Sequence, residues 1–100
     1  MRGFSLLSIE NEVLEPDDVI IAGVSYEEGY KFNKLLAEKG LHNVVYYNTI
    51  PMSLVTHETI LSHKKSVLLA LPLLDVFYEN DKSQCSALQE TFPGMHIINK

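Results

Sequence analysis

A glycine and a serine follow the apolar run at residues 19–22, at the kind of strand-to-helix turn where many α/β proteins hold a phosphate or a cofactor. A dinucleotide site requires Gly-x-Gly-x-x-Gly at such a turn. Here the three positions hold Gly23, Ser25 and Glu28, so two of the three glycines are missing. The chain also contains neither the Gly-Lys-Ser/Thr of a phosphate-binding loop nor the Gly-x-Ser-x-Gly of a hydrolase nucleophile. The turn predicts neither nucleotide binding nor a nucleophile.

Ser25 and Glu28 instead have the spacing of a capping box, in which serine and glutamate satisfy each other's backbone amides at the start of a helix. Glu27 and Glu28 also place two negative charges in the first helical turn, where they suit the helix dipole and would repel a phosphate. We therefore expect this turn to begin a helix rather than to hold an anion.

The other side chains that could bind a metal are four histidines and one cysteine: His42, His57, His63, His96 and Cys85. The histidines have no i, i+4 spacing and no His-Glu-x-x-His motif occurs, so they do not form a recognisable metal site. A single cysteine excludes an intramolecular disulfide and a cysteine-based zinc cage, and we expect the Cys85 side chain to pack in the core. We predict no metal, no cofactor and no catalytic residue.

The composition narrows the class of partner. With 46% hydrophobic and 21% charged residues, the chain is typical of a globular protein. Its longest apolar run, residues 67–74, is far shorter than the roughly 20 residues of a bilayer crossing, so we expect no membrane association. A net charge of −5 argues against nucleic-acid binding by this chain alone, because that binding depends on neutralising phosphates. The single cysteine suits a cytoplasmic protein.

The chain alternates strand-like apolar runs with segments of helical spacing. We expect strands at 19–23, 44–47, 67–71 and 95–98, and helices at 25–39, 53–65 and 81–91. The run at 67–71 is the most apolar and should be the central strand. This alternation predicts a small three-layer α/β sandwich, doubly wound, with at least four parallel strands. The length of 100 residues indicates a single domain, in which residues 1–18 form an edge strand, a short helix or a tail.

A ligand site would lie where the carboxyl ends of parallel strands meet, because open α/β sheets bind ligands at that edge. The residues that follow the expected strands, and are therefore candidate ligand contacts, are Gly23, Ser25, Asn48, Thr49 and Asp75.

Two pairs of tyrosines are candidates for a protein interface, where aromatic residues are enriched. Tyr46 and Tyr47 should point to opposite faces of their strand, so that one is in the core and the other is free for contacts. Tyr26 and Tyr30 lie on adjacent turns of the first expected helix.

The order of elements and two stretches, residues 19–29 and 66–75, resemble the enzyme-IIB-type domain of the sugar phosphotransferase system. The second stretch is similar to an apolar strand of that family that ends in Pro-Leu. Variants of the domain occur as regulatory modules of bacterial transcription regulators. The family's phosphocysteine lies in the loop after the first strand, where this chain has Val24-Ser25-Tyr26. The resemblance therefore implies a flavodoxin-like or enzyme-IIB-like sheet in a catalytically silent, regulatory relative.

Two functions remain open. The first is a non-enzymatic regulatory or protein-interaction module that binds a protein partner or associates with itself. Self-association is expected because the strands at 44–47 and 95–98 carry no Asp, Glu, Lys or Arg to block pairing at a sheet edge. The alternative is a protein that binds a small ligand, or transfers a phosphoryl group, at the carboxyl edge of the sheet.

Overall fold

The computed structural model describes residues 1–9, 12–22, 26–47 and 51–100, except for the side chains of Leu7, Tyr26 and Glu28. Its strands are β1 (Arg2–Ser5), β2 (Val19–Ala22), β3 (Val44–Tyr47), β4 (Val76–Glu79) and β5 (His96–Asn99). Its α-helices are α1 (Tyr26–Glu38), α2 (His57–Ala70) and α3 (Lys82–Thr91), with single 3-10 turns at η1 (Leu6–Ile9) and η2 (Met52–Leu54).

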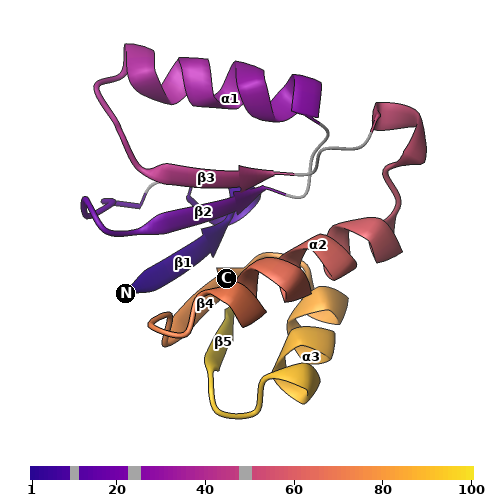
Figure 1. Cartoon of the computed structure of the whole chain (residues 1–100). Coiled ribbons are helices and arrows are strands. Elements are labelled where there is room, and N and C mark those ends of the chain that lie inside the picture. Colours follow the sequence, from indigo (N-terminus) through magenta and orange to yellow (C-terminus); the bar gives the residue numbers. More distant parts are fainter. Residues whose placement is uncertain (10–11, 23–25, 48–50) are drawn as a thin grey trace.

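The five strands form one sheet in which every neighbouring pair is parallel, and helices cover both of its faces. The strand order is β3-β2-β1-β4-β5. Helix α1 lies on one face, and α2 and α3 lie on the other (Figure 1). The predicted fold class, a small three-layer α/β sandwich with at least four parallel strands, is confirmed. Within this class the order 3-2-1-4-5 is that of Rossmann-type sheets, whereas a flavodoxin-like sheet runs 2-1-3-4-5.

Strand β1 corrects the prediction for residues 1–18. It is neither an edge strand nor a tail but the central strand, because Phe4 pairs with Ile20 of β2 on one side and with Tyr78 of β4 on the other. Phe4 is fully buried, and its ring stacks on that of Tyr78 with centroids 4.7 Å apart. The strand has only four residues, and its place in the sheet is set by the strands with which it pairs, at residues 19–21 and 76–78. No local sequence pattern indicates this pairing.

Helix α2 corrects the prediction of a central strand at residues 67–71. Thr56 caps this helix by accepting a hydrogen bond from the Thr59 amide, and the helix continues to Ala70. Its buried residues Lys64, Val67 and Leu68 have helical spacing, while Leu69 is 77% exposed. A short apolar run fits a buried strand and a helix face equally well, so periodicity alone could not decide between them.

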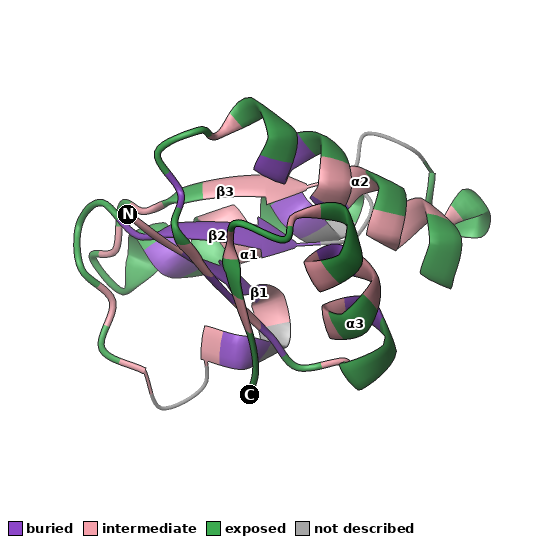
Figure 2. Ribbon diagram, turned by 90° about the horizontal axis from the view of Figure 1, so that it is seen from below, coloured by how far each residue is buried: buried purple, intermediate pink, exposed green. Residues whose placement is uncertain are grey.

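The apolar core lies mainly between the sheet and the pair α2–α3, and is formed by Val19, Ile21, Val67, Leu68, Leu74, Phe77 and Leu88. All four residues of β2 are buried, as expected for an inner strand covered on both faces. Figure 2 shows β2 and most of β1 coloured as buried, β3 as mostly intermediate, and much of the outer surface of the helices as exposed. The sheet therefore gives a rigid base for the residues at its two ends.

Candidate ligand site at the carboxyl edge of the sheet

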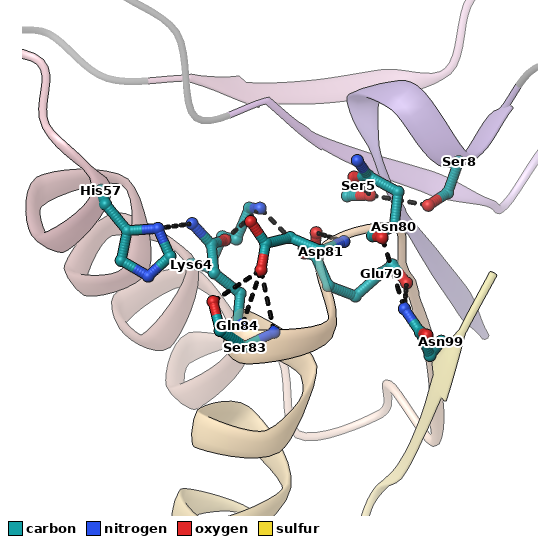
Figure 3. Close-up of polar contacts among 10 residues, drawn as sticks. All are labelled: Ser5, Ser8, His57, Lys64, Glu79, Asn80, Asp81, Ser83, Gln84 and Asn99. Atoms are coloured by element: carbon teal, nitrogen blue, oxygen red, sulfur yellow. Dashed lines mark hydrogen bonds and ion pairs between the residues drawn. The ribbon is translucent and has the colours of Figure 1, made fainter.

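The strand order reverses between β1 and β4, since β2 and β3 extend the sheet on one side of β1 and β5 extends it on the other. In doubly wound sheets the carboxyl ends of the strands at such a reversal border the ligand-binding crevice. Here these strands end at Ser5 and Glu79. Helices α2 and α3 both begin at this edge (Figure 1). Polar side chains surround Ser5 and Glu79 at this edge (Figure 3).

A buried ion pair lies at the end of β4. The Lys64 Nζ of α2 is 2.8 Å from the Glu79 Oε2, and the two residues are only 5% and 0% exposed. Lys64 also donates a hydrogen bond of 2.6 Å to the Gln84 Oε1 of α3. The second carboxylate oxygen of Glu79 accepts from the backbone amide of Asp81 at 3.2 Å. One lysine thus joins α2 to both β4 and α3.

The network continues to the surface through Gln84. Its Nε2 lies 3.3 Å from the Nδ1 of His57, the first residue of α2, which is exposed. On the other side, the Asp81 carboxylate caps α3 by accepting from the amides of Ser83 and Gln84 at 2.9 and 3.1 Å. The hydrogen bond from the Ser83 hydroxyl is the main cause that lowers the pKa of Asp81 below its usual value. Asp81 is therefore a carboxylate at neutral pH.

A second group of polar side chains follows β1. The buried hydroxyls of Ser5 and Ser8 are 2.8 Å apart, and the Ser5 hydroxyl donates to the Asn80 Oδ1 at 3.1 Å. Asn99, the last residue of β5, also belongs to this group and donates to the backbone carbonyls of Glu79 and Asn80. In a Rossmann-type dinucleotide site the glycine-rich turn would follow β1. Residues 5–9 are Ser-Leu-Leu-Ser-Ile and contain no glycine, so the turn after β1 lacks the phosphate-binding pattern.

The charge at this edge disfavours phosphate. A helix amino terminus attracts anions through its unpaired amides, but here side chains already accept from one amide of α2 and from two amides of α3. Thr56 and Thr59 form a capping box on α2, and the Asp81 carboxylate caps α3. The Glu79 charge is paired with that of Lys64. The arrangement therefore suits a neutral or cationic polar group better than an anion.

Buried polar side chains are concentrated at this edge. The described part of the chain has six buried polar or charged residues. Five of them belong to the network above: Ser5, Ser8, Lys64, Glu79 and Gln84. The sixth, Asp18, directly precedes β2 at the opposite edge, where Arg2 binds its carboxylate with two hydrogen bonds of 3.1 and 2.7 Å. This pairing raises the pKa of Arg2 above its ordinary value.

Three acidic residues lie close together just before β2. Carboxylate oxygens of Glu15, Asp17 and Asp18 lie within 4.8 Å of one another. Both oxygens of Asp18 are already bound by Arg2, and Oδ2 also accepts from the Glu15 amide. Arg2 and the Glu15 amide therefore account for both carboxylate oxygens of Asp18.

Of the predicted ligand residues, Gly23, Ser25, Asn48 and Thr49 lie outside the described residues, as does the Ser25–Glu28 capping box. The fifth, Asp75, is not brought to the carboxyl edge. Because residues 67–70 are helical, Asp75 comes just before β4 and lies at the amino edge. It accepts a hydrogen bond of 3.4 Å from the amino group of Met1, which is the main cause that lowers its pKa.

The tyrosines that were candidates for an interface have different surroundings. Tyr46 packs against the core on the α2–α3 face, Tyr47 lies against Gly29 of α1, and both residues are half-buried. Tyr30 is 66% exposed and can make contacts, whereas the side chain of Tyr26 lies outside the described set.

Cys85 is only half-buried at the margin of the core, and burial is the main cause that raises the pKa of its thiol.

Sequence reasoning missed the network because its residues look like ordinary surface positions. One signal was present: Lys64 stands three residues after Leu61 and three before Val67, on the apolar face of the helix. A lysine on such a face requires a buried partner. The partner, Glu79, ends a strand that was not recognised.

Comparison of the chain with protein-family models, with curated proteins and with solved structures gives no match. In the described residues, no helix combines the length and the apolar character needed to cross a bilayer.

Proposed function

We propose that this chain is a non-enzymatic module that binds a small polar molecule at the carboxyl edge of its sheet. The observation that supports the proposal is the concentration of buried polar side chains at the reversal between β1 and β4. Their position is the one at which open α/β sheets bind ligands.

The energetics of Lys64 and Glu79 support a functional interpretation. Removing two charges from water is costly, and well-packed apolar residues in place of a buried ion pair often give equal or greater stability. Lys64 and Glu79 are only 5% and 0% exposed, and stability alone does not explain why charged residues occupy these two buried positions. Buried ionisable groups in such an arrangement are candidates for functional sites.

The rim of the network defines the class of ligand. Asn80, His57 and Ser83 are exposed and can donate or accept hydrogen bonds. Asp81 contributes a negative charge beside them. A neutral or cationic polar molecule, such as an amino acid, a sugar or a small amine, fits this rim better than a phosphate. The proposed ligand class therefore favours small-ligand binding over phosphoryl transfer, which is the other activity considered for this edge of the sheet.

Nuclear magnetic resonance of the nitrogen-labelled protein tests the proposal directly. Amino acids, sugars, small amines and inorganic phosphate are added one class at a time. A ligand of the proposed class should shift the side-chain amide signals of Asn80 and Gln84. The matched controls are the side-chain amides of Asn43 and Gln89, which donate to the backbone carbonyls of Glu15 and Met95, outside the proposed site, and should not move.

A double substitution separates binding from folding. Lys64→Met with Glu79→Gln removes both charges, so the protein should fold while the ligand-induced shifts of Asn80 and Gln84 are lost. If no compound of the proposed classes moves these signals, or if the double variant responds as strongly as the unchanged protein, the proposal is wrong.

A protein-interaction function remains a second candidate because several large apolar side chains are exposed, among them Val13 (84%), Leu73 (79%) and Leu69 (77%). Leu69 and Leu73 are four residues apart, and exposed apolar side chains that lie together mark interaction sites. A regulatory role and self-association belong to this candidate.

A further inference from the structure

A groove lies at the amino edge of the sheet, opposite the proposed ligand site. It has a volume of about 530 Å³ between the carboxyl ends of α2 and α3, in the range that accommodates a drug-sized molecule or a few large side chains. Its walls are mainly apolar and include Leu69, Leu71, Leu74, Phe92 and Met95.

Two leucines make this groove unusual for a surface. Leu69 lines it and is 77% exposed, and Leu73, which lies between the lining residues Pro72 and Leu74, is 79% exposed. Neither side chain is needed for the core. Leucines that rim an apolar groove gain favourable burial only when a partner covers them.

The electrostatics of the groove favour a cation. The last carbonyls of a helix carry the negative end of its dipole, and α2 and α3 both end here without a basic residue in the last turn. Exposed Glu90 adds a negative charge in the last turn of α3. Asp75 lines the groove and is paired with the Met1 amine. The net charge of −5 attracts basic partners over a longer range.

We propose that this groove binds an amphipathic basic helix of a partner protein. The apolar face of that helix covers Leu69 and Leu73, and its Lys or Arg side chains reach the carbonyls at the ends of α2 and α3. Helix-in-groove recognition uses this combination of apolar anchors and flanking charge. The inference does not depend on the ligand site, which lies at the other edge of the sheet.

The test uses a helical peptide made only of leucine and lysine, with the leucines on one face, and its counterpart in which glutamate replaces lysine. Fluorescence anisotropy should show that the full-length chain binds the lysine peptide and not the glutamate peptide. The double substitution Leu69→Ser with Leu73→Ser should weaken binding about tenfold or more, as expected when anchor contacts are lost. Both side chains are exposed, so the variant should fold.

Val13→Ser is the matched control, because Val13 is 84% exposed and does not line this groove. This variant should bind the lysine peptide as the unchanged chain does. Three results would overturn the inference: no binding of the lysine peptide, equal binding of both peptides, or undiminished binding by the double leucine variant. Sedimentation that shows two copies joined through Leu69 and Leu73 would also overturn it, since a second copy would then occupy the groove.

Discussion

The ammonium group of Lys64 holds three elements together, because it donates from α2 to Glu79 of β4 and to Gln84 of α3. Removing one member of a buried ion pair leaves the other charge buried without its partner, which costs more than the pair contributes. The two charges are therefore best changed one at a time and then together.

Lys64→Met should lower the free energy of unfolding by about 3–5 kcal/mol, since the Glu79 carboxylate loses its counter-charge. Lys64→Met with Glu79→Gln should recover most of this loss, because no charge remains buried and the amide still accepts from the Asp81 backbone. Urea denaturation of both variants measures the difference. A single variant as stable as the unchanged chain would show that the pair is not buried in solution.

His63 makes stability depend on pH. Its Nε2 is buried without a hydrogen-bond partner, and burial is the main cause that lowers its pKa below 6.5. The unfolded chain therefore takes up a proton at a higher pH than the folded chain. The contribution of His63 to stability should be complete above about pH 6.5 and should fall as the pH drops below that value.

His63→Gln should reduce this loss of stability in acid, and denaturation between pH 5 and 7 measures it. His42→Gln is the matched control, because His42 is exposed. Equal acid sensitivity of the unchanged chain and His63→Gln would contradict the assignment.

Helix α1 packs on β3 through a close contact at Gly29. A Cβ atom at this position would lie 2.2 Å from the Tyr47 ring, so the ring or the helix would have to move. Gly29→Ala should therefore cost about 1–3 kcal/mol, although alanine favours helix by up to about 1 kcal/mol. Gly94→Ala is the control, because nothing lies within 4 Å of the added carbon. Thermal denaturation compares the two, and a stabilised Gly29→Ala protein would contradict this packing.

The elements that could be predicted are those with local signals. The branched residues of β2 and β3 indicated strands, and Asp81 and Gly40 mark a cap and a helix end, where Gly40 has a φ of 76°. Strand β4 was missed because it has only four residues and its last residue, Glu79, is charged although it is buried. The network of Ser5, Lys64 and Glu79 could not be predicted, because it depends on β1 being central and on α2 replacing the expected strand.

The whole sheet depends on β1, which separates β2 and β3 from β4 and β5. Deletion of residues 1–5 removes the strand that joins these two halves, together with the buried Phe4 ring. We expect the shortened chain to lose its cooperative unfolding transition and its native circular dichroism. A shortened chain that unfolds cooperatively at the same temperature would contradict the central place of β1.

The separation in sequence between β1 and β4 also affects how the protein folds during synthesis. The ribosome makes β1 before β4, yet Arg2 pairs with Val76 and Phe4 with Tyr78. This pairing can therefore form only after the residues up to β4 have left the exit tunnel. Pairing across so many residues slows folding, because the loop must close before the contacts form. Until then the Phe4 side chain has no complete core to enter, so the nascent chain carries its central strand with one of its two partner strands missing.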